Sequence, residues 1–119
     1  MVKRTKPVNP KLKALIQSLK RKSSEANLWK RIAKDLEKPT RRRRIVNLSR
    51  INRYTKENET IIVPGKVLGS GLLDHSLTIA AYSFSQGALE KINKANAKAI
   101  SIEEFMKEDI KGKRVRIIG

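Results

Sequence analysis

The sequence contains no cysteine and only one histidine among its 119 residues. The absence of cysteine excludes a disulfide scaffold, a thiolate-bound zinc or iron–sulfur centre, and a cysteine nucleophile. With His75 as the single imidazole, most histidine-based metal sites are excluded too, and little capacity is left for general acid–base catalysis near neutral pH. These absences predict a protein without a cofactor or a bound metal.

Aromatic residues and long apolar runs are also scarce. Trp, Tyr and Phe together make up 4% of the chain, and the longest nearly apolar run extends from Leu77 to Phe84. That run is far shorter than the roughly 20 residues that cross a bilayer as a helix. The basic N-terminus leads into Pro7 and an amphipathic stretch, not into the apolar core of a secretory signal. The acid-free start up to Glu25 also fits an organellar transit peptide, but its prolines and helical pattern favour a cytoplasmic protein with no membrane partner.

Acidic residues are few, and the charge is unevenly distributed. The 28 Lys and Arg face 11 Asp and Glu, which gives a formal net charge of +17. Residues 1–50 hold 17 basic and 3 acidic side chains, a net +14, whereas residues 51–119 hold 11 and 8, a net +3. Self-repulsion of this size weakens a compact state unless a polyanion neutralises it. Nucleic acid is therefore the leading class of partner, ahead of a membrane surface.

The length and composition suit a single domain of the α/β class. Hydrophobic residues make up 39% of the chain, enough for one modest core. The expected organisation is an N-terminal basic helix pair followed by a compact mixed strand–strand–helix body. The segments within this single domain, 1–119, are a basic tail at 1–8, the helix pair at 9–38, a basic linker with a short strand at 39–59, and the α/β body at 60–119.

Apolar residues at helical spacing predict the two N-terminal helices. Asn9-Pro10 is typical of a helix start, and apolar residues recur from Leu12 to Leu19. Ser23-Ser24 breaks this pattern, and a second apolar stripe that includes Trp29 follows it. Pro39 is expected to end the second helix, because the residue before a proline is disfavoured in helical conformation.

Short apolar segments separated by turn residues predict the rest of the fold. A strand is expected at 45–48, with Ser49 capping a helical turn after it. In the body, the expected features are strands at 60–63 and 66–68 with a turn at Pro64-Gly65, a strand of a mixed sheet at 77–82, a helix capped by Ser83 or Ser85, a last helix opened by the capping box Ser101–Glu104, and a closing strand at 115–118.

Four consecutive arginines, Arg41 to Arg44, are the sharpest feature of the sequence. Arginine offers a planar fork of donors for phosphate, and its charge does not titrate away. Side chains of an extended segment alternate in direction, so the run can bridge two phosphate strands. The alternatives are a solvated charge run or a nuclear-import signal. The residues predicted to bind nucleic acid are Lys3, Arg4, Lys6, Lys11, Lys13, Lys20, Arg21, Lys22, Lys30, Arg31, Lys34, Arg41, Arg42, Arg43, Arg44, Arg50, Arg53 and Lys66.

Two further patterns resemble catalytic or nucleotide-binding motifs but do not meet their requirements. The glycines around Gly69 lack both the Gly-Lys-Ser/Thr of a phosphate loop and the third glycine of a dinucleotide fingerprint, so turn glycines are expected. Asp74-His75-Ser76 contains the residue types of a hydrolase triad, but adjacent residues do not generally form the required relay. His75 is expected to be an ordinary surface histidine in a loop.

The few aromatic residues divide into core candidates and one candidate for RNA contact. Trp29 and Phe105 lie on apolar helical stripes and are expected in the core. Tyr54, flanked by Arg53 and Lys56, is the aromatic residue that stays a candidate for stacking on an unpaired base.

Several segments together resemble a known family. The stretches 46–51, 63–71, 77–85, 88–92 and 112–115 are similar to the archaeal and eukaryotic large-subunit ribosomal protein family eighteen-e, which is related to bacterial large-subunit protein fifteen. The resemblance covers essentially the whole chain, and the short length is similar to the archaeal type. It implies a structural protein that binds large-subunit rRNA beside neighbouring ribosomal proteins, with no small-molecule substrate.

The chain departs from the family pattern in two places. Ala95-Asn96-Ala97 stands where the family usually has a Gly-Gly turn, and Asn also tolerates the left-handed conformation of a helix cap. The long glycine-rich arm of the bacterial relative is missing, so residues 1–8 are not expected to penetrate the RNA core deeply.

Two other functions remain as alternatives from the residues themselves. The helix pair has the outline of a DNA-binding helix-turn-helix, as in a basic regulator or chromatin protein, although both helices are basic and the turn lacks glycine. An enzyme acting on RNA would need a carboxylate pair or a metal cluster that the sequence does not suggest.

Overall fold

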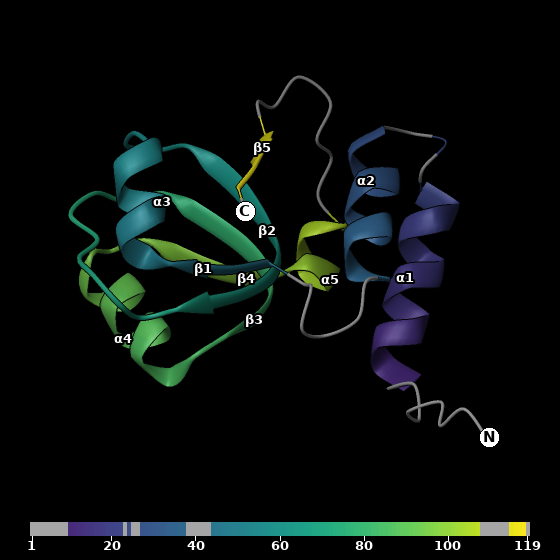
Figure 1. Ribbon diagram of the computed structural model, residues 1–119. Coiled ribbons are helices and arrows are strands. Elements are labelled where there is room, and N and C mark those ends of the chain that lie inside the picture. Colours follow the sequence, from purple (N-terminus) through teal and green to yellow (C-terminus); the bar gives the residue numbers. More distant parts are fainter. Residues whose placement is uncertain (1–9, 23, 25–26, 38–43, 108–114, 119) are drawn as a thin grey trace. The chain divides into compact units, whose positions relative to one another are not determined.

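The computed structural model describes residues 10–22, 24, 27–37, 44–107 and 115–118 (Figure 1). The chain divides into two compact units, Met1–Glu37 and Lys38–Gly119, and each unit has its own architecture. The α/β class is confirmed, with basic helices preceding a sheet. The single-domain organisation stays a prediction. The elements are α1 Pro10–Lys22, α2 Asn27–Leu36, β1 Arg44–Asn47, α3 Leu48–Tyr54, β2 Thr60–Leu68, β3 Thr78–Phe84, α4 Gln86–Lys94, β4 Lys98–Ser101, α5 Ile102–Phe105 and β5 Val115–Ile117.

The first unit contains the predicted helix pair, in which α1 contacts α2. The apolar stripe of α1 buries Leu12, Leu15 and Leu19, in agreement with the spacing in the sequence. In α2 the stripe is buried as well, and Trp29 is 1% exposed. The helix α2 ends at Leu36, ahead of Pro39, which lies outside the described residues.

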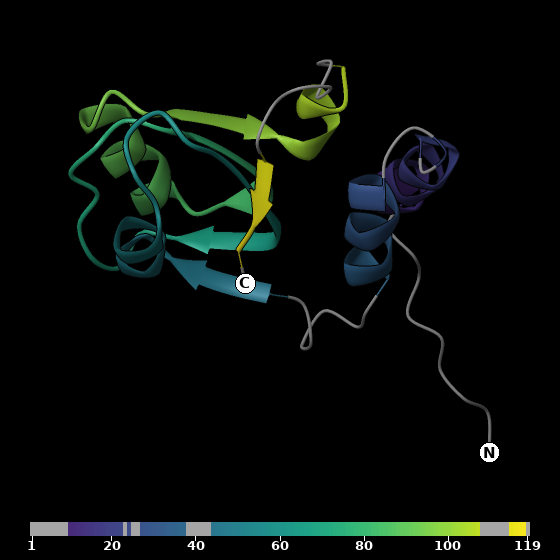
Figure 2. The same ribbon diagram turned by 90° about the horizontal axis from the view of Figure 1, so that it is seen from above.

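The second unit is built on a parallel sheet in the order β1-β2-β3-β4, with β5 also paired to β2 (Figures 1 and 2). All four described pairings are parallel. The prediction that 77–82 forms a strand of a mixed sheet is therefore wrong, because the strand found there, β3, belongs to a parallel sheet. The central strand β2 has β3 along one edge. On its other edge, β5 pairs with Thr60–Ile62 and β1 pairs with Gly65–Leu68.

The expected turn at Pro64-Gly65 is wrong, because both residues lie inside the single strand β2. The register with β3 shifts between Val63 and Lys66, which is the mark of a β-bulge. Pro64 has no N–H to donate to a neighbouring strand. It lies between the part of β2 that pairs with β5, which ends at Ile62, and the part that pairs with β1, which begins at Gly65. The bulge therefore accommodates a proline in a central strand, where proline otherwise breaks the hydrogen-bond ladder.

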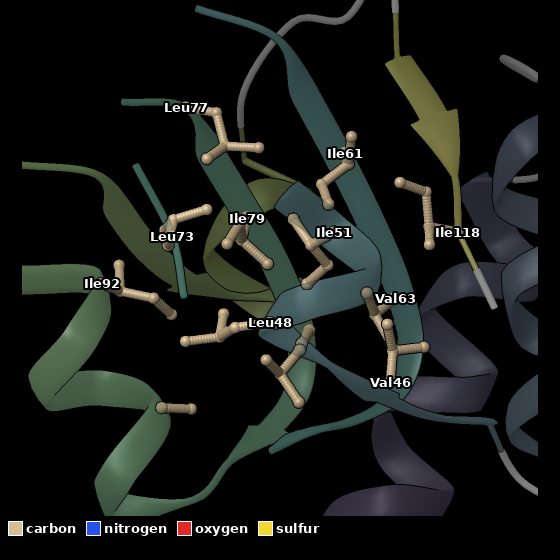
Figure 3. Close-up of a cluster of buried hydrophobic side chains, with 13 residues drawn as sticks. Val46, Leu48, Ile51, Ile61, Val63, Leu73, Leu77, Ile79, Ile92 and Ile118 are labelled. Carbon is tan, nitrogen blue, oxygen red and sulfur yellow. The ribbon is translucent and has the colours of Figure 1, made fainter. Parts of the chain in front are cut away.

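A cluster of buried hydrophobic side chains in the second unit lies on one face of the sheet (Figure 3). Side chains alternate along each strand, which places Ile61, Val63 and Ile79 on this face. Helix α3 contributes Ile51 and α4 contributes Ile92, so both helices pack on the same side. On the alternate positions, Ile62, Ala80 and Ile100 are also buried, and α5 contacts β3 and β4.

Two of the predicted helix caps are confirmed, and one is wrong. Ser85 caps α4 by accepting a hydrogen bond from the Ala88 amide at 3.2 Å, and Ser101 caps α5 in the same way through Glu104 at 3.1 Å. The expected cap at Ser49 is wrong, because α3 begins at Leu48 and its N-cap position is Asn47. Strand β4 was not predicted. It follows a left-handed turn at Asn96, whose φ of 56° is the conformation expected of an Asn cap.

Candidate nucleic-acid interface

The predicted binding residues fall into a part that the structure describes and a part that it does not. Six of them lie outside the described residues, and for Arg44, the first residue of β1, only the backbone is described. Those six are Lys3, Arg4, Lys6, Arg41, Arg42 and Arg43. Of the others, Lys22 is half-buried and the rest are exposed, as binding to a polyanion requires.

The outer face of α2 carries three cations side by side. Lys30, Arg31 and Lys34 are all exposed, and they fall within about 100° of one another around the helix axis. Within the described part of the chain, none of the three takes part in an ion pair. We call these three residues the α2 stripe. Because the opposite side of α2 is buried through residues such as Trp29 and Leu36, the stripe is held on a fixed face.

The cations of α1 are more engaged with their surroundings. The ammonium of Lys20 lies 3.1 Å from a carboxylate oxygen of Glu37, and Lys22 Nζ lies 5.3 Å from the centre of the Trp29 ring. The last turn of α1 also carries Arg21, so three cations complement the negative end of the helix dipole. Part of the predicted α1 surface therefore has an intramolecular role in addition to any contact with nucleic acid.

A second basic face lies on α3. Arg50 and Arg53 are exposed on the side of α3 that points away from the core, and Tyr54, which is also exposed, is the last residue of the helix. The guanidinium carbon of Arg50 is 5.3 Å from the centre of the Tyr54 ring. Lys66 is not part of this face, since it alternates with the buried Val67 and projects from the opposite side of the sheet.

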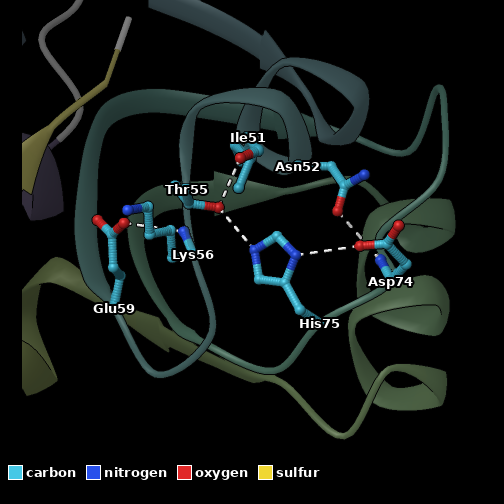
Figure 4. Close-up of polar contacts among 7 residues, drawn as sticks. All are labelled: Ile51, Asn52, Thr55, Lys56, Glu59, Asp74 and His75. Atoms are coloured by element: carbon cyan, nitrogen blue, oxygen red, sulfur yellow. Dashed lines mark hydrogen bonds and ion pairs between the residues drawn. The ribbon is translucent and has the colours of Figure 1, made fainter.

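The loop at 69–77 holds α3 in place through three contacts, of which Figure 4 shows the two made by Asp74 and His75. The amide of Ser49 donates to the carbonyl of Ser70 at 3.1 Å, and the amide of Asp74 donates to Asn52 Oδ1 at 3.1 Å. At the end of α3, His75 Nε2 lies 2.8 Å from the hydroxyl of Thr55. The loop therefore fastens the beginning, middle and end of the helix that carries the second basic face.

His75 is not the ordinary surface histidine that the sequence suggested. Its side chain is only 15% exposed, and Nδ1 lies 3.1 Å from Asp74 Oδ1. Since Nε2 of the same ring contacts the Thr55 hydroxyl, Asp74, His75 and Thr55 are linked in the order of a catalytic triad. The buried Thr55 hydroxyl also donates to the carbonyl of Ile51 at 2.6 Å. A nucleophile must be reachable by its substrate, and Thr55 is 7% exposed. We conclude that this arrangement is structural.

The glycines of the loop have roles in close packing. A Cβ at Gly69 would lie 2.6 Å from the backbone carbon of Gly87, so the loop touches the first turn of α4. Lys91 of α4 donates to the carbonyl oxygens of Gly69 and Gly71 at 2.6 and 2.7 Å. The role of Lys91 had no sequence signal, because lysines on exposed helices are common and the two acceptors are backbone atoms 20 and 22 residues away.

The contact between Asp74 and His75 predicts a change of stability with pH. The hydrogen bond from the His75 ring holds the pKa of the Asp74 carboxyl below its ordinary value of 3.8. A lowered pKa means that the charged carboxylate stabilises the fold above pH 3.8, and that this contribution is lost as the pH falls through the lowered pKa. Between pH 7 and pH 2, the melting temperatures of wild type and Asp74→Asn should therefore differ above pH 3.8, with wild type the more stable, and should converge as the pH falls through the lowered pKa of Asp74. Parallel curves would contradict the contact.

Among the described residues, no group of three or more His, Asp or Glu is placed to hold a metal ion. The helices in the described part are also too short or too polar to cross a membrane.

Comparison with known proteins identifies the family. A sequence model matches residues 11–100, and its family is described as the ribosomal proteins 50S-L15, 50S-L18e and 60S-L27a. The chain belongs to this family of ribosomal proteins, and the matched range includes both basic faces. The resemblance to family eighteen-e is thereby confirmed.

Archaeal relatives of the chain share the name of one member of the family. Each of three relatives is called large ribosomal subunit protein eL18. The chain is 46% identical to that of Methanothermobacter thermautotrophicus and 49% identical to that of Methanoregula boonei, each over 120 residues, and 45% identical to that of Sulfurisphaera tokodaii over 118 residues. Each alignment covers 99% of this chain and at least 98% of the relative.

Proposed function

We propose that this protein is a structural constituent of the large ribosomal subunit, without enzymatic activity, and that it binds large-subunit rRNA. Its place would be the cytoplasmic large subunit, with neighbouring ribosomal proteins as further partners. Membership of the ribosomal protein family supports this proposal, as do relatives named for the large subunit that match nearly the full chain. The 18 basic residues predicted to bind nucleic acid, including the arginine run, remain part of it.

The α2 stripe is the observation that carries the proposal of RNA binding. Three cations on one fixed face, with no anion of the described chain paired to them, can neutralise phosphates without first breaking an internal ion pair. Solvent-exposed charges of this kind contribute little to folding. Their clustering on α2 is therefore better explained by a polyanionic partner than by stability.

Salt dependence of binding tests the proposal. The variant Lys30→Gln/Arg31→Gln/Lys34→Gln keeps chain length and hydrogen-bonding capacity but removes three positive charges. Its affinity for deproteinised large-subunit rRNA should fall, and the slope of log K against log salt should become shallower by about 2–3, since each phosphate contact contributes about 0.7–0.9. Filter binding between 50 and 300 mM salt measures both quantities.

A matched control separates the α2 stripe from net charge. Lys94→Gln/Lys98→Gln/Lys107→Gln also removes three exposed cations, but none of them belongs to the predicted interface. This variant should change the slope by less than one unit. Equal losses in the two variants would refute a localised interface. Equal affinity of wild type for duplex DNA and for rRNA would favour the DNA-binding alternative that the basic helix pair leaves open.

A further inference from the structure

The outer face of α3 combines one aromatic ring with two guanidinium groups. Arg50, Arg53 and Tyr54 lie within about 100° of one another around the helix axis. Tyr54 is 50% exposed, whereas Trp29 and Phe105 are at most 1% exposed. The helix sequence from Leu48 to Tyr54 contains no acidic residue. The face is therefore positively charged and carries the aromatic ring that is most exposed among the described residues.

The arrangement of these groups fits a nucleotide. Arg50 lies over one face of the Tyr54 ring at 5.3 Å, which holds the ring by a cation–π contact. Base–aromatic stacking is sequence-tolerant because every base has a π-face, and Arg side chains beside the ring can take the flanking phosphates. We propose that Tyr54 is a stacking platform for an unpaired base of the RNA, with Arg53 binding an adjoining phosphate. This inference rests on the proposed function, since it names a contact of the same RNA.

The platform is held in place before any RNA binds. The contacts Ser49–Ser70, Asn52–Asp74 and Thr55–His75 fasten α3 to the loop at 69–77, and Ile51 anchors the inner side of the helix in the core. A surface that is already ordered loses little conformational entropy when a partner binds, which favours affinity. The solitary ring also argues against a protein partner, because protein interfaces are centred on larger apolar clusters.

A double-mutant cycle between protein and RNA tests the proposal. The protein variants are Tyr54→Leu, which removes the ring, and Tyr54→Phe, which keeps it. The RNA probes are a 12-nucleotide oligouridylate and the same backbone with an abasic ribose at every position. Fluorescence anisotropy at low salt gives the affinities. Wild type and Tyr54→Phe should bind the base-bearing probe more tightly than Tyr54→Leu by about 5- to 150-fold, the range for one stacked base.

The abasic probe provides the decisive comparison. Wild type and Tyr54→Leu should bind it equally, because no base is present to stack. The salt slope of Tyr54→Leu should match that of wild type, whereas Arg53→Gln should lower the slope by about 0.7, the contribution of one phosphate in a single strand. Thermal unfolding of Tyr54→Leu should be unchanged, since the side chain is half exposed.

Three results would overturn the platform. One is equal affinity of wild type and Tyr54→Leu for the base-bearing probe. Another is an equal loss for both probes, which would indicate a structural role or a general phosphate contact. The third is no binding of the oligouridylate under conditions in which large-subunit rRNA still binds, which would leave the proposed function standing. If wild type did not bind large-subunit rRNA at all, the proposed function itself would be refuted.

Discussion

Replacing Trp29 with alanine is expected to lower the free energy of unfolding by about 3–5 kcal/mol, the range for removing a large buried aromatic side chain. Trp29 is 1% exposed and lies on the buried stripe of α2. The substitution leaves a cavity and also removes the contact with the Lys22 ammonium at 5.3 Å. Urea unfolding followed by far-UV circular dichroism measures the change, because the variant contains no tryptophan for a fluorescence signal.

A conservative variant distinguishes packing from RNA stacking at the same position. Trp29→Phe keeps an aromatic ring but reduces its volume, so its loss of stability should be clearly smaller than that of Trp29→Ala. Both variants should bind RNA normally at temperatures where they are folded. If Trp29→Ala retained full stability but lost RNA affinity, Trp29 would be a stacking residue and its place in the core would be wrong.

The N-terminal helices were predictable because their apolar spacing is local. Leu12, Leu15 and Leu19 repeat at the period of a helix, and no tertiary contact is needed to recognise that pattern. The same is true of the caps at Ser85 and Ser101, where a serine side chain bonds to an amide three residues later. Features set by residues close in sequence were thus predicted well.

Features set by distant strands were not predictable in the same way. Pro64-Gly65 is typical of a turn, yet its place in β2 depends on where β1 and β5 stop pairing with that strand. Strand β4 lies in the short segment Lys98–Ser101, which is identified as a strand only by its pairing with β3. The role of His75 likewise depends on Thr55, which lies 20 residues earlier in the chain.

The candidate interface was predictable in its charge but not in its geometry. Composition identified Lys30, Arg31 and Lys34 as binding candidates, and helical periodicity places them on one face. Periodicity does not show that Lys20 is paired with Glu37, which requires contact between residues 17 positions apart. The stacking of Arg50 on Tyr54 follows from i, i+4 spacing on a helix, but its use as a platform depends on the loop that fixes α3.

The substitution Gly71→Ala, in the loop at 69–77, should destabilise the protein by about 2–6 kcal/mol. Gly71 has a φ of +97°, a conformation that residues with a side chain rarely adopt. An added Cβ would also lie 2.3 Å from the Cβ of Ser49 and 2.8 Å from its Cα. The backbone of α3 cannot yield without losing its contact with Ser70, so strain and overlap add to each other.

Gly87→Ala is the matched control, because the two glycines differ in what surrounds them. Nothing lies within 4 Å of a Cβ built at Gly87, which is in the helix α4. Alanine there should be neutral or stabilise the protein by up to about 1 kcal/mol, since it is the better helix former. Thermal and urea unfolding of both variants, compared with hydrogen exchange of the amides of α3, would show whether α3 loosens in Gly71→Ala alone. If Gly71→Ala were as stable as Gly87→Ala, the close contact between the loop and Ser49 would be refuted, and with it the argument that α3 is ordered before RNA binds.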